Sequence, residues 1–566
     1  MRRTLRDGYG IDDLRADVLA GVVVGVVALP LSMALAIAVG APPQHGLYTA
    51  IVAGASSALF GGCKLQVTGP TAAFVVILAP IVSKHGLSGL LTAGFMAGVI
   101  LIVLGAARLG ALIRFVPYPV TTGFTTGIAT VIATLQIKDV FGLRTGPLPD
   151  RYVDKLATLW AARGTASVRE LAVAAGTLAL LVTIPRVIRR IPAPLIAIAI
   201  ASSICAAIHR SDPDFAIQTI GSRFHTTVAG VEVAGIPGVV PAPALPWGSG
   251  VPSLALLGDL LGPAFAIAML GAIESLLSAV IADGMTNTKH DPNAELVGLG
   301  IGNMLAPIFG GIAATGALAR TATNVRGGAR SPVAAVAHAV FVLLSILLFA
   351  PFVADVPMAS LAALLLVVAW NMSEVHTFAR LLRVSPRGDR FVLVTCLLLT
   401  VFFDMVVAVA IGFVLAAVLF MRRMAEMTES SLTLDASRDG ASRPPRGVVV
   451  YAINGPLFFG AAQKAMALLF DIRASSYDVL VIHVGRVSVI DATGFVALEN
   501  AIGRVVRGGK PVVLAGPLPE PRAMFDEALL RSKVDGLHVA DTLDAALRLA
   551  AELAACERRR VRSATS

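Results

Sequence analysis

Residues 66–73, Gln-Val-Thr-Gly-Pro-Thr-Ala-Ala, and residues 313–320, Ala-Ala-Thr-Gly-Ala-Leu-Ala-Arg, are the two stretches that decide the fold. Both run from small residues through a Thr-Gly pair into a helix-forming stretch that is about half as long as a bilayer crossing. Each Thr-Gly pair follows by fifty-odd residues an aspartate, Asp17 or Asp259, that opens a long apolar span. Similar short segments at corresponding places in two halves of a chain are typical of inverted repeats in a membrane protein.

The breaks in these two spans predict a site. An irregular backbone at membrane depth is tolerated only where protein or a water-filled cavity covers it. We therefore expect residues 64–68 and 311–315 to be extended and to end near the bilayer midplane. The helices that follow begin there, with unpaired N–H groups and about half a positive charge at each start. Two such starts that face each other make an anion site. The alternative is two loops that only pack.

The composition indicates a polytopic membrane protein. Apolar residues make up 56% of the 566 residues and charged residues 14%, with a mean hydropathy of +0.80, whereas a soluble domain has about 25% charged residues. The net charge of +10 fits the positive-inside rule, and we expect no nucleic-acid partner. The four cysteines are far apart in the chain, so they predict no disulfide framework. We expect no metal and no cofactor.

The chain divides into a membrane part and a soluble part. Residues 1–15 form a cytoplasmic lead-in, and residues 16–424 form a membrane domain of about fourteen segments. A polar linker, residues 425–446, precedes a small α/β domain, residues 447–555, and a basic tail, residues 556–566. The distribution of Lys and Arg places the N-terminus and the soluble domain in the cytoplasm and makes residues 210–253 an external connector.

The predicted membrane segments are long apolar runs, two half-length stretches and one amphipathic stretch. The long runs are 18–39, 47–60, 90–109, 119–137, 168–184, 192–208, 254–281, 294–308, 333–352, 360–370 and 391–420; the half-length stretches are 71–82 and 316–325; the amphipathic crossing is 372–382. In the soluble part we expect strands at 447–453, 479–484 and 511–515, and helices at 461–473 and 494–506.

Two charged residues fall inside predicted membrane segments. Glu274 is the one ionisable residue between Asp259 and Asp283, and a carboxylate at the bilayer centre costs roughly 2.5–3.5 kcal/mol, which makes it a functional candidate. Arg320 falls in the first turn of the second half-helix, where a cation opposes the helix dipole unless an anion lies nearby. The alternative is that Glu274 and Arg320 pair as a buried tether, and a pair that breaks during transport would satisfy both interpretations.

At these residues the chain closely resembles the SulP family of anion transporters, the bacterial relatives of the animal sulfate, chloride and bicarbonate exchangers and of prestin. The resemblance extends over nearly the whole chain. Its motifs are Asp17-Val18-Leu19-Ala20-Gly21, Gly46-Leu47-Tyr48, Thr68-Gly69-Pro70-Thr71, Gly123-Phe124 with Gln136-Ile137-Lys138, Thr219-Ile220-Gly221-Ser222, Glu274-Ser275-Leu276, Glu295-Leu296 with Gly300 and Asn303, and Ala319-Arg320-Thr321 with Asn324.

The resemblance implies a polytopic α-helical fold of seven-plus-seven inverted repeats, in which a core domain moves against a gate domain, and a C-terminal cytoplasmic STAS domain. It also implies a homodimer in the bacterial cytoplasmic (inner) membrane. The residues that it places at the substrate, together with the two broken segments, are Leu35, Gly69, Pro70, Thr71, Ala72, Thr315, Gly316, Ala317, Leu318, Ala319 and Arg320.

Within the family the chain is most similar to the enterobacterial C4-dicarboxylate transporters, through residues 28–36, 271–274, 370–374 and 455–459. We therefore expect a secondary transporter of succinate or fumarate. Many family members have Pro-Gln in the first span where this chain has Pro30-Leu31, so their substrates do not carry over directly. Sulfate or bicarbonate transport is the alternative, as is an anion sensor or channel. No motif indicates an enzyme.

The coupling ion is expected to be the proton. In sodium-coupled bicarbonate members of the family, an Asp, a hydroxyl one turn later and a Thr bind sodium, and the matching positions here are Glu274, Ser278 and Leu318. Leu318 removes an oxygen ligand that a hard cation needs. A buried carboxylate favours its protonated form, which suits Glu274, with Ser278, to carry a proton together with the anion.

Residues 491–494, Asp-Ala-Thr-Gly, match the loop that STAS domains place at a helix N-terminus. By this resemblance Asp491 and Thr493 are regulatory candidates, because related domains carry a phosphorylatable hydroxyl at the position of Thr493. The interpretation that we favour is that Thr493 caps the helix. A cytoplasmic partner that binds this domain is a further expectation.

Overall fold

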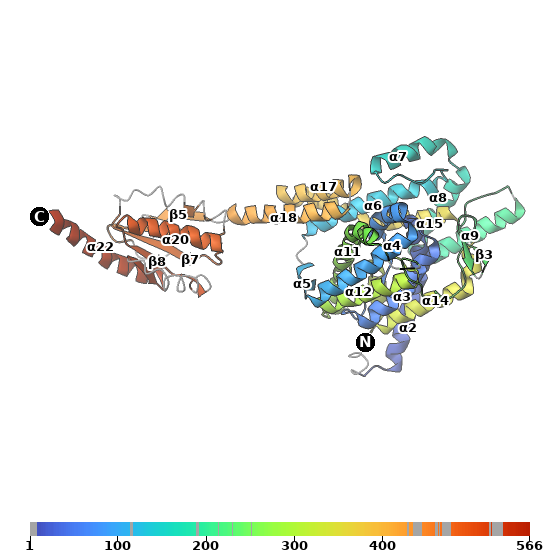
Figure 1. Ribbon diagram of the computed structural model, residues 1–566, viewed down its shortest axis with the longest axis horizontal. Helices are drawn as coiled ribbons and strands as arrows, with labels where there is room; N and C mark the ends of the chain where they lie inside the picture. The colour runs from blue at the N-terminus through green and yellow to red at the C-terminus, as the bar shows by residue number, and fades with distance from the viewer. Residues whose placement is uncertain are drawn as a thin grey trace. The chain divides into compact units, whose positions relative to one another are not determined.

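The computed structural model (Figure 1) describes residues 8–565 apart from 114–116, 188–191, 213, 229, 249, 251, 404, 427–428, 434–443, 459–461, 463–464, 467–476, 520–521 and 523–535. The chain forms two compact units, Met1–Val414 and Leu415–Ser566. The first unit is mainly helical, as lipid requires of a chain that must satisfy its backbone hydrogen bonds internally. The second is a mixed α/β unit.

The first half of the membrane unit contains one broken span. Its elements are α2 (Ile11–Val39), α3 (Pro43–Phe60), β1 (Thr68–Gly69), η1 (Ala72–Phe74), α4 (Val75–Ala106), α5 (Gly110–Ile113), α6 (Tyr118–Val140), α7 (Tyr152–Ala161), η2 (Ala162–Thr165), α8 (Val168–Val187) and α9 (Ala193–Ser211). Gly86 interrupts α4 with a φ of 66°, a conformation that glycine adopts at little cost. The part of α4 before Gly86, together with η1, is the predicted half-length stretch, and the part after it is the predicted long run.

A small connector precedes the second half, which also contains a broken span. The connector holds α10 (Ile220–Arg223), β2 (His225–Val228) and β3 (Val231–Ala234), and the second half consists of α11 (Leu254–Thr286), α12 (Pro292–Ile308), β4 (Thr315–Gly316), α13 (Leu318–Arg326), α14 (Val333–Val353), α15 (Met358–Ser373), α16 (Val375–Val384), α17 (Arg387–Phe402) and α18 (Met405–Glu426). Strands β2 and β3 form an antiparallel hairpin within the predicted connector.

The packing of the two halves has the symmetry of a repeat. Helix α4 packs on α11 and α12, and its counterpart α14 packs on α2 and α3 (Figure 1). These helices and α13 make up the central bundle. Beside them, α6 packs on α15 and α17 while α15 packs on α6 and α8, and α8 packs on α9; these form the flanking bundle. Apart from the α8–α9 contact, exchanging the halves exchanges these contacts with one another, as expected for inverted repeats.

Two segment predictions are wrong, and one boundary is refined. The expected crossing at 372–382 is α16, whose ten residues reach only about 15 Å, half of the hydrocarbon thickness. The expected single run 391–420 is divided between α17 and α18. Helix α2 begins at Ile11, within the expected lead-in, where the carboxylate of Asp13 accepts a hydrogen bond from the backbone N–H of Gly10.

Both halves contain helices that are long enough to span a membrane. Within the described ranges, eight helices are long and apolar enough to cross a membrane; they are 11–39, 72–106, 118–140, 168–187, 193–211, 254–286, 333–353 and the continuous run 358–384. The half-helix α13, with nine residues, is too short to cross, because it begins at a break in its span.

The second unit is built on one five-stranded sheet. The strands are β5 (Glu429–Thr433), β6 (Val448–Asn454), β7 (Val479–Arg486), β8 (Val512–Ala515) and β9 (Leu537–Ala540), in that spatial order. β5 is antiparallel to β6, and the remaining pairs are parallel. Helix α20 (Ala492–Arg507) contributes to the apolar core on one face, which includes Leu498, and α22 (Leu543–Thr565) contributes to the core on the other, which includes Leu547.

Two boundaries of the soluble part need correction. β5 lies inside the expected linker, because its backbone pairs with β6 as an edge strand. The expected basic tail begins inside α22, where the side chain of Arg558 also donates a hydrogen bond to the carbonyl oxygen of Ala554, 3.1 Å away. The expected strands and the helix at 494–506 are present, whereas the expected helix at 461–473 lies mostly outside the described residues.

Candidate functional site

The two breaks in the membrane spans meet in the central bundle. β1 and β4 pair antiparallel, with Thr68 opposite Gly316 and Gly69 opposite Thr315. The first half-helix starts three residues after β1, at Ala72, and the second starts two residues after β4, at Leu318. Pairing of the two short strands therefore holds the N-terminal ends of the two half-helices close together, as an anion site requires.

Polar side chains of neighbouring helices form hydrogen bonds with the extended backbone around the paired strands β1 and β4, a place that we call the crossing. Asn303 of α12 both donates to the carbonyl of Ala314 and accepts from its N–H, each at 2.8 Å. Thr321 of α13 accepts from the N–H of Val67 at 3.1 Å, and Asn324 donates to the carbonyl of Leu65 at 2.9 Å. These bonds replace the ladder that a broken helix cannot supply, which is the condition for irregular backbone at this depth.

Arg320 is a buried cation at the point where the half-helices meet. Its side chain is 2% exposed, and its Nη2 donates a hydrogen bond to the carbonyl oxygen of Pro70. Its Nε and Nη1 have no hydrogen-bond partner among the described residues. A buried cation without a counter-charge is costly. Together with the two helix starts, Arg320 makes the crossing strongly positive.

Close packing explains why glycine recurs in both breaks. A Cβ atom on Gly69 would lie 2.4 Å from Nη1 of Arg320, and one on Gly316 would lie 2.2 Å from Nε2 of Gln66. Both distances are far below van der Waals contact, so any side chain at either position would displace a neighbour. The repeated Thr-Gly pair therefore marks the places where the two breaks approach the rest of the site.

Glu274 lies on α11 and is hydrogen-bonded to Thr71, the residue directly before the first half-helix. Its Oε2 accepts a hydrogen bond from Oγ1 of Thr71 at 2.9 Å, and the residue is partly accessible. Among the described residues no ion pair joins Glu274 to Arg320, and the hydrogen bond that Arg320 donates goes to Pro70. The structure does not contain the tether that we considered as an alternative.

The other predicted site residues differ in their burial and in their hydrogen bonds. Ser278 donates to Oγ1 of Thr321 at 3.0 Å, so it joins α11 to α13. Leu318 is 48% exposed at the start of α13, beside exposed Ala319, whereas Leu35 is buried on α2. The residues that remain, Gly69, Pro70, Ala72, Thr315, Gly316 and Ala317, are buried.

Glu295 is a buried carboxylate of the crossing that the sequence predictions did not include among the site residues. Its Oε2 accepts from the N–H groups of Gly62 and Cys63, both at 2.9 Å, and its Oε1 accepts from Gln66 at 2.8 Å and Ser275 at 3.1 Å. It thus fixes the chain that leads into β1. A carboxylate within the apolar run 294–308 was a sequence signal that Glu295 has a role. The groups that donate hydrogen bonds to Glu295, however, lie in other helices and loops.

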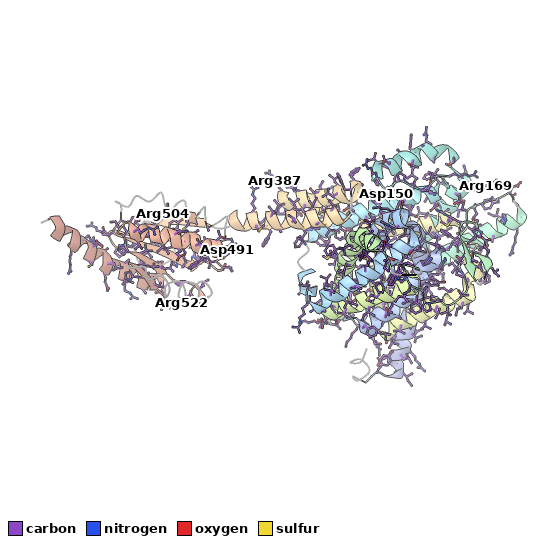
Figure 2. The ribbon with its side chains drawn as sticks, viewed as in Figure 1. Asp150, Arg169, Arg387, Asp491, Arg504 and Arg522 are labelled. Carbon is purple, nitrogen blue, oxygen red and sulfur yellow. The ribbon has the colours of Figure 1, made fainter. Side chains whose placement is uncertain are left out.

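In the soluble unit, Asp491 and not Thr493 caps a helix. Oδ1 of Asp491 accepts from the N–H of Gly494 at 2.6 Å, at the start of α20. The prediction that Thr493 is the cap is therefore wrong. Thr493 lies exposed in the first turn (Figure 2 labels the neighbouring Asp491).

The fold and the crossing define a class: a multi-pass membrane transporter of two inverted repeats with two half-helices, followed by a separate α/β unit. The family follows from comparison with known sequences. The sulfate permease family model matches residues 14–396 and the STAS domain model matches residues 442–546, and the chain belongs to the sulfate permease (SulP) family of anion transporters. The expected fold and family are confirmed.

Relatives and solved structures agree with this placement. The chain is 41% identical over 537 residues to the putative sulfate transporter YvdB of Bacillus subtilis, covering 95% of this chain and 98% of that protein. It is 29% identical to the bicarbonate transporter BicA of a Picosynechococcus species, with 92% of each covered. Its fold is similar to that of the murine anion transporter Slc26a9 in the inward-facing state, with a TM-score of 0.85 and 19% identity over 97% of this chain and 93% of that one.

Proposed function

We propose that this protein is a secondary active transporter that takes up small anions across the bacterial cytoplasmic membrane together with protons. The N-terminus and the STAS domain lie in the cytoplasm in this proposal. The anion binds at the crossing of β1 and β4, where the two half-helices begin.

One observation carries the proposal: Arg320 is buried at two helix starts with Nε and Nη1 unpartnered among the described residues. The site therefore has positive charge and hydrogen-bond donors that suit an anionic ligand. A small anion bound between the half-helices would supply the counter-charge and accept hydrogen bonds from the helix starts.

Glu274 is the proposed proton carrier. It is partly accessible and bonded to Thr71, next to the start of the first half-helix. A negative carboxylate there would repel an incoming anion, whereas a protonated carboxyl would not. Binding of the anion is therefore linked to protonation of Glu274, and the anion and the proton cross the membrane together.

For the substrate we favour C4-dicarboxylates such as succinate and fumarate. Leu318 and Ala319 expose apolar surface at the start of α13, and this surface would contact the carbon chain of a dicarboxylate. Sulfate is the second candidate, because the relative with 41% identity is named a putative sulfate transporter. Bicarbonate is a third, from the name of the relative with 29% identity.

A transport assay separates these candidates. The full-length protein in liposomes is given labelled succinate, sulfate or bicarbonate with an inward proton gradient, with or without sodium. We expect accumulation of succinate that collapses with a protonophore and needs no sodium. Accumulation of sulfate without succinate would assign the second candidate. Absence of both accumulation and counterflow for all three would indicate a sensor instead of a transporter.

Two further expectations belong to the same proposal. The family resemblance favours a homodimer, which size-exclusion chromatography with light scattering would test. Exposed Thr493 at the start of α20 is the proposed place for regulation or for a cytoplasmic partner, and mass spectrometry of the protein from cells would detect a phosphate there.

A further inference from the structure

A basic cavity lies between the central and flanking bundles, away from the crossing. Its volume is about 250 Å³, and it is lined by the C-terminal ends of α2 and α6, the first part of α4 and the start of α15. Ala79, which lines it, lies seven residues after Ala72, or about 10 Å farther along the helix. The cavity is thus at the other end of the half-helix from the crossing.

Charged side chains surround this cavity, and the cations are in excess. Lys138, Lys155 and Arg223 line it together with Asp139 and Asp150, the last of which is labelled in Figure 2. Nη1 of Arg223 forms an ion pair with Oδ1 of Asp139 at 2.7 Å. Asp139 therefore lies between two cations, Arg223 and Lys138, and Asp150 faces Lys155, so the lining carries three cations against two carboxylates.

The two lysines lack close partners. Both are half-buried, and in the part of the chain that the structure describes no hydrogen bond or ion pair is formed by either ammonium group. Burial lowers the pKa of Lys155, which Asp150 opposes through space. A small anion between Lys138 and Lys155 would stabilise both charges, because Coulomb attraction is stronger in a partly desolvated cavity than in water.

We propose that this cavity is a capture site, in which Lys138 and Lys155 hold a small dianion such as sulfate or a dicarboxylate before it reaches the crossing. The cavity faces the outside in the orientation proposed above, because α2 ends and α15 begins there. The inference rests on the proposed function for the direction of transport, but binding of the anion does not require transport. Basic clefts of this kind raise the local concentration of an anion and its association rate.

Labelling of one cysteine tests the site without a transport measurement. Ser83 lines the cavity and is exposed, whereas Cys63, Cys205 and Cys396 are buried. In a full-length S83C/C556S protein we expect sulfonatoethyl methanethiosulfonate, an anion, to react on the order of 10-fold faster than the trimethylammonium reagent of opposite charge. In K138Q/K155Q this preference should disappear, whereas K138R/K155R should keep it. Retention in K138R/K155R would also show that the fold tolerates substitution at both positions.

The matched control is R144Q, which removes one exposed cation from the segment between Lys138 and Pro147 but none from the lining of the cavity. R144Q should keep the preference for the anionic reagent; a loss equal to that in K138Q/K155Q would show a general surface potential and overturn the site. Sulfate or succinate should slow the labelling of S83C by the anionic reagent, also in an R320Q background whose crossing is impaired. Loss of this protection in R320Q would show that no separate site exists.

Uptake distinguishes failure of this proposal from failure of the proposed function. In liposomes K138Q/K155Q should raise KM for the external anion by on the order of 10-fold at low salt, with kcat nearly unchanged and a weaker dependence on ionic strength. An unchanged KM and salt dependence would overturn the capture site. If no anion is transported but charge-selective labelling and anion protection persist, the capture site stands and the transport function is wrong.

Discussion

The side chain of Arg320, in the second half-helix, donates a hydrogen bond to the carbonyl oxygen of Pro70, next to the start of the first. One buried guanidinium therefore contacts both breaks, although the two residues are 250 positions apart in the chain. Because its remaining N–H groups lack partners among the described residues, the charge of Arg320 is available to an anion at both helix starts.

Replacing Arg320 by Gln should weaken anion binding by roughly 10- to 100-fold, because a hydrogen bond to a charged group contributes about 1.5–3 kcal/mol. Arg326→Gln is the matched control, since Arg326 lies exposed at the end of the same helix. Isothermal titration of the purified proteins with succinate and sulfate measures both. Equal affinities for the two variants would exclude a role of Arg320 in binding.

Replacing Gly69 by Ala should disturb Arg320 directly, because the added Cβ would lie 2.4 Å from its Nη1. We expect a loss of about 1–3 kcal/mol in stability, the usual cost of overpacking. The same substitution in an R320A background should cost much less, since the clashing atoms are gone. Thermal unfolding of the four proteins of this cycle measures the coupling; additive effects would contradict the contact. Gly176→Ala, in an open position of α8, is the control.

Replacing Glu295 by Gln should destabilise the membrane unit. The carboxylate accepts four hydrogen bonds, from Gly62, Cys63, Gln66 and Ser275, and the NH2 of Gln would face N–H donors. Each unsatisfied buried group costs about 1–3 kcal/mol, so the melting temperature should fall. Glu232→Gln, on exposed β3, should leave it unchanged. A melting temperature equal to that of the parent would show that Glu295 does not organise the crossing.

The breaks in the spans could be predicted from the sequence because their signal is local. A Thr-Gly pair before a short apolar helix identifies β1, β4 and both half-helices without knowledge of their partners. The division of residues 391–420 into two helices was missed, although the sequence has an ionisable residue, Asp404, between the end of α17 at Phe402 and the start of α18 at Met405.

The contacts of the site were less accessible to sequence reasoning. Glu295 and Gln66 are 229 positions apart, and nothing in either segment indicates that they bond. The same holds for Arg320. The sequence indicated its charge and allowed an ion pair with Glu274, but it did not predict the hydrogen bond to Pro70 that the structure contains. Long-range hydrogen bonds depend on how the two repeats pack, which residue spacing does not determine.

Deleting the chain after Glu426 should leave the membrane unit folded, because the chain separates into two compact units near this point. We expect the truncated protein to unfold cooperatively in detergent, close to the melting temperature of the full-length protein, but to show reduced transport or abundance. Size-exclusion chromatography, thermal unfolding and uptake per molecule measure these three properties. Wild-type uptake at wild-type abundance would show that the STAS domain is dispensable.

The last prediction concerns the proton. Glu274 is bonded to Thr71 beside the start of the first half-helix, so its charge acts directly on an anion bound there. In Glu274→Gln the side chain stays neutral, like the protonated acid, and cannot release a proton inside.

Two assays then give opposite results. Counterflow of labelled substrate at equal pH needs no net movement of protons, so we expect Glu274→Gln to retain it, whereas accumulation driven by an inward proton gradient should be lost. Asp259→Asn, at an exposed position of the same helix α11, should retain both activities. A Glu274→Gln protein that still concentrates substrate under the gradient would assign coupling to another group. We expect no requirement for sodium, because Leu318 offers no oxygen ligand where a hard cation would need one; uptake that requires sodium would contradict coupling to the proton.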